Sequence, residues 1–182
     1  FENKALHIHS DFAPEFPSEI LKLIENWGAS FETLQVNILE RVKENQKMSC
    51  YWCSTQRRSE LLNYALKHGY NKIALGHHMD DILETFLMNM LEKGNLSTMI
   101  PKMQYEKWPV CIIRPLSYAS EKRIIQHAKE KGYYGFTCTC NFQENSTRKQ
   151  ARNRLELLTG GDEKTKERMF SALKNVQKEY LL

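Results

Sequence analysis

Three carboxylates lie close together in one short acidic run, Gly76-His77-His78-Met79-Asp80-Asp81-Ile82-Leu83-Glu84-Thr85. Asp80 and Asp81 fall in the first turn of the helix expected here, and Glu84 lies one turn further on the same face. Carboxylate oxygens are preferred Mg²⁺ ligands, so the run predicts a magnesium site. A well-capped helix whose acidic first turn is favoured by the helix dipole explains the same charges without a metal.

Five cysteines offer a second kind of chemistry, because two of them, Cys50 and Cys53, form a CxxC pair. An odd number of cysteines argues against a disulfide framework. Cys138 and Cys140 lie far later in the chain, and either could add a third thiolate to a zinc or iron–sulfur site. The residues alone leave open both the metal and the choice of third ligand. Cys111 lies in an apolar segment and is expected to be core.

Alternating apolar strands and amphipathic helices must position these residues. We expect strands at 5–9, 31–39, 72–75 and 110–113, and helices at 18–28, 54–68, 80–91, 121–131, 147–158 and 163–180. This order predicts an α/β fold, a doubly wound parallel sheet followed by C-terminal helices. Such sheets bind ligands at the carboxyl ends of their strands. The residues expected at those ends are His9, Ser10, Asp11, Gly76, His77 and Arg114.

Composition and charge narrow the class of protein. The 182 residues are 41% hydrophobic and 26% charged, with a formal net charge of +4. Neither a secretory leader nor a run of about 18 apolar residues is present, so we expect a cytoplasmic protein without a membrane span. Arg57 and Arg58 follow the cysteine pair, and residues 148–154 read RKQARNR. Basic clusters beside candidate chemistry suit a phosphate-rich partner.

The acidic run Gly76-His77-His78-x-Asp80-Asp81-x-x-Glu84-Thr85 resembles the GHxxDDxxET signature of PP-loop ATP pyrophosphatases that modify tRNA bases. Arg114-Pro115-Leu116 is similar to a later block of that family. The resemblance implies an adenine nucleotide alpha hydrolase-like fold, with ATP and Mg²⁺ as cofactors. It also implies that a base oxygen attacks the α-phosphate of ATP, pyrophosphate leaves, and a nucleophile then displaces AMP.

The CxxC pair indicates which branch of the family the chain resembles. Cys50-x-x-Cys53-Ser54-x-x-Arg57-Arg58 resembles the tRNA 2-thiocytidine synthetase branch, in which two central cysteines and one later cysteine hold a [4Fe–4S] cluster. This likeness implies tRNA and a sulfur donor, cysteine desulfurase or sulfide, as partners. The segment 145–155 is also similar to tRNA lysidine synthetases, but those enzymes need no cysteine cluster. We expect the last helix either to pack on a neighbouring element or to form the contact of a homodimer.

Within this resemblance the candidate site residues take two roles. We expect Asp80, Asp81 and Glu84, with Cys50 and Cys53, to be catalytic. ATP or tRNA phosphate contacts are expected from the strand-end residues His9, Ser10, Asp11, Gly76, His77 and Arg114 and from Arg57 and Arg58. We expect a nucleotide-binding domain over residues 1–136, and a cysteine-bearing loop with C-terminal helices over 137–182.

The chain departs from the family pattern at its start. The glycine-rich SGGxDS phosphate loop is absent, and residues 5–9 resemble the family's second strand. We therefore expect a further segment upstream of Phe1 in the native protein. Two alternatives to tRNA thiolation stay open: a nucleotide- or RNA-binding module with a degenerate phosphate loop, and an ATP pyrophosphatase that acts on a small metabolite or makes lysidine.

Overall fold

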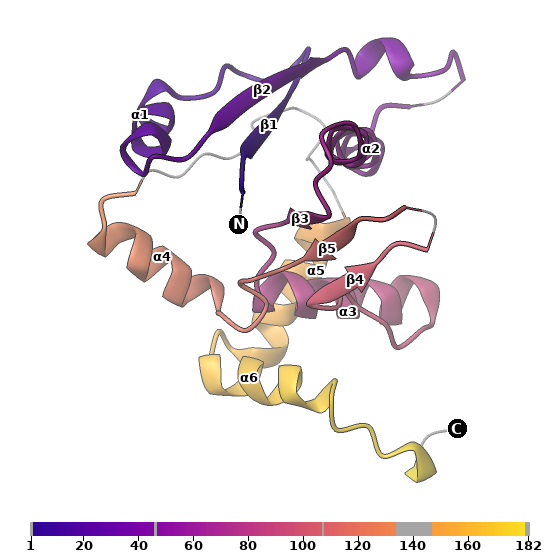
Figure 1. Ribbon diagram of the computed structural model, residues 1–182. Helices are drawn as coiled ribbons and strands as arrows, with labels where there is room; N and C mark the ends of the chain where they lie inside the picture. Colours follow the sequence, from indigo (N-terminus) through magenta and orange to yellow (C-terminus); the bar gives the residue numbers. More distant parts are fainter. Residues whose placement is uncertain (1, 46, 107, 134–146, 181–182) are drawn as a thin grey trace. The chain divides into compact units, whose positions relative to one another are not determined.

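The computed structural model describes residues 2–45, 47–106, 108–133 and 147–180 (Figure 1). The chain forms two compact units. The first contains Phe1–Ile73, Glu106–Val110 and Gln126–Glu144, and the second contains Ala74–Tyr105, Cys111–Ile125 and Asn145–Leu182. The domain boundary expected between residues 136 and 137 lies outside the described residues.

The first unit is built on two parallel strands, β1 (Ala5–Ser10) and β2 (Phe31–Val36). They pair in register from Ala5 opposite Phe31 to Ser10 opposite Val36, and helix α1 (Ser18–Asn26) connects them. A short 3₁₀ helix, η1 (Leu39–Arg41), follows β2. Strand, helix and parallel strand follow the expected order, and β2 ends at Val36 rather than the predicted residue 39.

Helix α2 (Cys50–Lys67) packs on one face of this strand pair. Its side chains meet a small apolar core formed by Ile8, Val36 and Ile38. Glu32 of β2 accepts hydrogen bonds from the Tyr64 hydroxyl at 2.6 Å and from the Lys4 ammonium at 2.9 Å, which ties α2 and the segment before β1 to the same strand.

Helix α2 begins earlier than the predicted residue 54. Ser49 is extended, and its hydroxyl accepts a hydrogen bond from the Trp52 backbone N–H at 3.2 Å, which is the geometry of an N-cap. The cap places both residues of the CxxC pair, Cys50 and Cys53, inside the first helical turn. At the other end, Gly69 takes a positive φ of 73°, which ends the helix as predicted.

A second, small sheet has the strand order β3-β5-β4, and its strands β4 and β5 belong to the second unit. Its strands are β3 (Lys72–Ala74), β4 (Lys102–Gln104) and β5 (Cys111–Ile113). The sequence did not predict β4, which runs antiparallel to β5 with Met103 opposite Ile112. The strand is only three residues long and only Met103 is partly buried, so it has no apolar pattern to reveal it. The predicted all-parallel sheet therefore carries an antiparallel strand.

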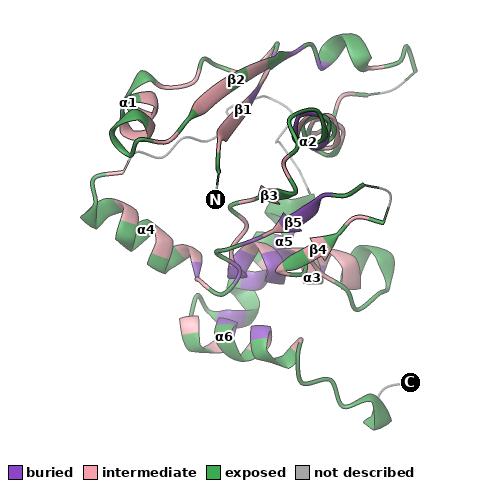
Figure 2. Cartoon of the chain, in the orientation of Figure 1, coloured by how far each residue is buried: buried purple, intermediate pink, exposed green. Residues whose placement is uncertain are grey.

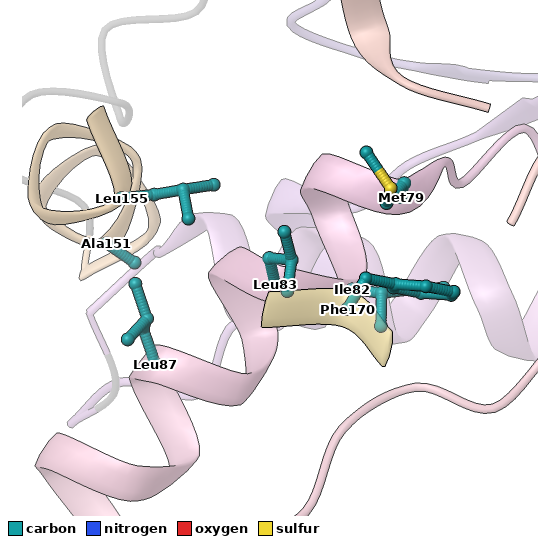
Figure 3. Close-up of a cluster of buried hydrophobic side chains, with 7 residues drawn as sticks. All are labelled: Met79, Ile82, Leu83, Leu87, Ala151, Leu155 and Phe170. Atoms are coloured by element: carbon teal, nitrogen blue, oxygen red, sulfur yellow. The ribbon is translucent and has the colours of Figure 1, made fainter. Parts of the chain in front are cut away.

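Three helices supply the core of the second unit: α3 (Met79–Lys93), α5 (Thr147–Thr159) and α6 (Glu163–Ala172). Their buried side chains form one cluster, drawn in Figure 3: Met79, Ile82, Leu83, Leu87, Ala151, Leu155 and Phe170. The buried residues of α3 and α5 face each other while their outer surfaces stay exposed (Figure 2). This amphipathic packing fixes the start of α3 against α5.

Two further helical elements complete the described chain, α4 (Glu121–Glu130) and the 3₁₀ helix η3 (Lys178–Tyr180). The last predicted helix, 163–180, is therefore divided, because α6 already ends at Ala172. Within the described residues, no helix has the length and apolar character needed to cross a bilayer.

Candidate functional site

The acidic run forms the N-terminal turn of α3, in the second unit. His78 is the extended N-cap residue, and the Asp81 carboxylate accepts its backbone N–H at 2.9 Å. The His78 imidazole Nε2 lies 3.3 Å from the same carboxylate. Asp81 therefore stabilises the start of the helix, as the capping interpretation of the sequence predicted.

Asp80 is buried, with 3% of its surface exposed, and is bonded on both carboxylate oxygens. Oδ2 accepts the backbone N–H of Glu121 at 2.7 Å, which joins α3 to the start of α4. Oδ1 lies 3.1 Å from the ammonium of Lys166 on α6. Lys166 is itself buried and also binds Glu156 of α5 at 2.5 Å. Burial alone lowers the pKa of Lys166. The hydrogen bonds with Glu156 and Asp80 outweigh burial, so the pKa lies above its ordinary value.

Glu84 is the most deeply buried carboxylate of the three, with 1% of its side chain exposed. Arg152 Nε donates to Oε1 at 2.7 Å and Arg148 Nε donates to Oε2 at 3.2 Å. Arg148 also donates through Nη2 to Asp81 at 2.8 Å. The hydrogen bond with Glu84 raises the pKa of Arg152 above its ordinary value.

The carboxylates at the start of α3 thus bind cations of the chain itself. A buried charge must be paired, and here Arg148, Arg152 and Lys166 pair it. Within the described residues, no three histidine, cysteine, aspartate or glutamate side chains are placed to hold a metal ion. The magnesium role expected for Asp80, Asp81 and Glu84 stays a prediction, and the observed geometry does not fit it.

A cavity of about 230 Å³ opens beside Asp80. It is lined by residues of α3, α4 and α6 and of the turns before the latter two: Asp80, Ser120, Glu121, Lys122, Ile125, Gly161, Glu163 and Lys166. The Ser120 hydroxyl donates to Glu163, joining the start of α4 to the start of α6. The buried side chains of Asp80 and Lys166 both line this cavity.

The segment between β3 and α3 contains Gly76 and His77, and Arg114 follows β5. Arg114 is buried; its Nε donates to His77 Nδ1 at 3.3 Å and its Nη1 donates to the Ile100 carbonyl at 2.5 Å. Three residues predicted at strand ends are therefore together in the second unit, on segments that leave β3 and β5.

The first unit holds the other strand-end residues. Ser10 is buried at the end of β1, next to His9. The Asp11 carboxylate accepts the backbone N–H groups of Ile38 and Leu39, each at 3.1 Å, and so holds the turn after β2. The structure gives Asp11 the role of a turn former, and His9 and Ser10 lie beside it at the carboxyl end of the strand.

The cysteine pair lies in the same unit, in the first turn of α2. Cys50 and Cys53 are both partly buried and are one helical turn apart, so their side chains share a face. The N-terminal end of a helix favours thiolates, because its unpaired N–H groups carry partial positive charge. Cys138 and Cys140 lie outside the described residues. Cys111 is buried in β5, as expected for a core residue.

Arg57 and Arg58 are exposed on α2, beyond the cysteine pair. Burial is the main cause that lowers the pKa of His7, on β1, and the positive charge of Arg57 lowers it further. The two arginines therefore add positive charge to the unit that holds the cysteines.

Sequence reasoning missed Lys166 altogether, and it did not foresee that Arg148 and Arg152 bind the acidic run. A signal was present, because arginines spaced i,i+4 on α5 match carboxylates spaced i,i+3 on α3. Lys166 offered none, because a lysine in a polar helix is ordinarily exposed.

The fold and the α3 signature agree with the comparison to known families. Residues 5–157 match the family described as the PP-loop domain, and the chain belongs to this family.

Curated relatives are similar over most of the chain. The tRNA-cytidine(32) 2-sulfurtransferase of Variovorax paradoxus is 38% identical over 177 residues, which cover 93% of this chain and 56% of the relative. That of Marinobacter nauticus is 36% identical over 173 residues, covering 92% and 57%. The chain thus spans little more than half the length of these relatives.

One solved structure shares the fold. The U34-tRNA thiolase NcsA from Methanococcus maripaludis, solved with its [4Fe-4S] cluster, matches with a TM-score of 0.74 at 17% identity. The match covers 98% of this chain and 63% of that one. This likeness confirms the predicted α/β fold class.

Proposed function

We propose that this chain is the core of an ATP-dependent tRNA sulfurtransferase that replaces the 2-oxygen of a cytidine with sulfur. The observation that carries the proposal is the similarity to tRNA-cytidine(32) 2-sulfurtransferases over more than nine-tenths of this chain. A CxxC pair in the first turn of a helix supports it, because thiolates there suit sulfur chemistry.

The proposed reaction has two steps. The cytidine 2-oxygen attacks the α-phosphorus of ATP, the bond to the bridging oxygen breaks, and pyrophosphate leaves with that electron pair. A sulfide-level sulfur then attacks C2 of the adenylated base, and AMP departs with the original oxygen. No electrons are gained or lost in these two steps. Sulfide can therefore act as the sulfur donor directly, whereas a cysteine desulfurase requires a reductant.

Basic residues are proposed to meet the phosphates of this reaction. Arg148 and Arg152 keep 45% and 48% of their side chains exposed while their Nε groups are held by Glu84. Each therefore presents part of a fixed guanidinium to solvent, which suits phosphate oxygens of ATP or tRNA. We propose nucleotide contacts for the strand-end residues as well: His9, Ser10, Asp11, Gly76, His77 and Arg114. Arg57 and Arg58 are proposed to contact tRNA.

The cofactor proposal rests on Cys50 and Cys53, which would hold a [4Fe–4S] cluster with Cys138 or Cys140 as the third ligand. Two thiols one turn apart at a helix N-terminus fit such a group. When bound, the cluster supplies an iron site for the sulfur that is transferred. Zinc is the alternative metal for the same thiolates. Magnesium is assigned no ligand among the described residues, because Asp81 and Glu84 are already paired.

For the whole protein we propose the cytoplasm as its place of action, tRNA and a sulfur donor as partners, and a homodimer as its assembly. An apolar groove of about 460 Å³ in the second unit supports a contact surface near the last helix. Exposed Leu96, Val176 and Tyr180 line it. Light scattering on the purified full-length protein tests the dimer, and a monomeric mass contradicts it.

The reaction is tested with full-length protein reconstituted without oxygen, ATP labelled in its α-phosphate, sulfide, and tRNA from a strain that lacks the gene. We expect AMP formation that requires tRNA and equals the thiocytidine formed. AMP formation that requires a small metabolite instead would assign another pyrophosphatase activity. Tight tRNA binding without AMP would indicate a binding module.

A further inference from the structure

The indole N–H of Trp52 is a buried donor without a partner among the described residues. Trp52 lies between Cys50 and Cys53, in the first turn of α2. Its backbone N–H is satisfied by the Ser49 hydroxyl at 3.2 Å, so the unsatisfied donor is the side chain alone. An indole N–H can only donate, and burying one unpaired is unfavourable. No described residue therefore supplies an acceptor at this position.

The surroundings of this donor are apolar and contain a thiol. Trp52 and Cys53 both pack against the cluster of Ile8, Val36 and Ile38. Trp27, an exposed tryptophan of the same unit, shows the contrast, because 56% of its surface is open to water. Bulk water cannot accept a hydrogen bond from Trp52 Nε1, because that atom is buried. A group bound at the neighbouring Cys50 and Cys53 would bring an acceptor to this part of α2.

We propose that the Trp52 indole N–H donates a hydrogen bond to a sulfur atom of the metal centre held by Cys50 and Cys53. The inference rests on the proposed iron–sulfur function. Cluster sulfur is negatively charged and becomes more so on reduction, so a donor stabilises the reduced state more than the oxidised one. Trp52 is thus a positioning residue that raises the reduction potential of the centre.

The test uses the full-length protein with its cluster reconstituted, and compares Trp52→Phe with the unsubstituted chain. Phe keeps an aromatic ring in the apolar cluster and removes the N–H. We expect a more negative midpoint potential in an electron paramagnetic resonance titration. A tenfold change in the redox equilibrium, about 59 mV for one electron, is the expected order. Iron content should be unchanged.

Tyr51→Phe is the matched control, because it changes the other aromatic residue of the CxxC motif. Tyr51 is 80% exposed, so its substitution should leave the potential unchanged. Equal potentials in all three proteins would overturn the inference. A loss of stability without a change of potential in Trp52→Phe would also overturn it, because it would show a packing role only.

A second measurement is made on the unsubstituted protein. Pulsed electron paramagnetic resonance on protein with isotopically labelled tryptophan should detect coupling between the reduced cluster and an indole nitrogen. Absence of this coupling, or its persistence in a folded Trp52→Phe protein, contradicts the assignment. A protein that takes up no iron refutes both this inference and the proposed cofactor. An iron-loaded protein that shows the coupling but thiolates no tRNA refutes the proposed function alone.

Discussion

The guanidinium of Arg152 donates to the buried carboxylate of Glu84 across 2.7 Å, and this bond joins α5 to α3. Glu84 has 1% of its side chain exposed, whereas Arg152 has 48%. The pair is therefore asymmetric. The arginine can return to water if the bond breaks, but the carboxylate cannot, so Glu84 depends on its partners more than they depend on it.

Substitution of Glu84 by Gln should lower the free energy of unfolding by about 2 kcal/mol, because the single amide oxygen can accept from only one arginine and does so more weakly, while the NH2 group cannot accept from the other. Urea unfolding measures the change. The control is Arg154→Gln, which removes an ion pair to Glu92 in which both side chains are about two-fifths exposed. That change should cost less than about 0.5 kcal/mol. Equal losses in the two variants would show that Glu84 contributes no more than a surface charge.

Truncation of Leu83 to Ala should cost about 3 kcal/mol, since its side chain is fully buried between α3 and its neighbours. Leu91 lies on the same helix with 52% of its surface exposed and provides the comparison. Leu91→Ala should cost under about 1 kcal/mol. A Leu83→Ala protein as stable as Leu91→Ala would mean that the α3 core is packed differently.

Acid should destabilise the first unit through His7. Burial lowers the pKa of His7 in the folded protein, and the charges of Arg57 and His9 lower it further. The unfolded chain then binds a proton more readily, so stability is complete above about pH 6.5 and falls as the pH drops towards the folded pKa.

His7→Gln removes this titration. Its urea midpoint should change less between about pH 7.5 and about pH 5.5 than that of the unsubstituted protein. Parallel pH profiles for the two proteins would exclude His7 as a source of acid sensitivity.

Loss of either motif cysteine should remove the metal centre. Cys50→Ser and Cys53→Ser proteins, purified without oxygen, should lack the visible absorption and iron of the parent. Cys111→Ser should keep both, because Cys111 is buried in β5. The third ligand is proposed to be Cys138 or Cys140, and the serine variant of whichever cysteine binds the cluster should also lose iron. Retention of full iron in Cys50→Ser would contradict the assignment.

Much of the fold could be predicted from periodicity and end signals. Gly69 and Gly94 end α2 and α3 with positive φ, and both ends were close to prediction. Strand β4 was missed because it is only three residues long and only Met103 is partly buried, so it shows no apolar pattern. The start of α2 was misplaced because the Ser49 cap acts through a single side chain.

The candidate site was predicted less completely. The sequence identified the acidic turn of α3 but not the protein cations that pair with its carboxylates, and the magnesium role stays a prediction. Arg148 and Arg152 bind Glu84, whereas Arg154 binds exposed Glu92. The neighbouring residues in the sequence do not reveal this difference. Burial makes that difference, and burial is decided by how α5 packs against α3.

Thiolation of cytidine is tested most directly by mass spectrometry of tRNA nucleosides from a strain without the gene. We predict that 2-thiocytidine disappears, that the intact gene restores it, and that a gene with Cys53→Ser does not. An unchanged amount of 2-thiocytidine in the strain without the gene would contradict the proposed function.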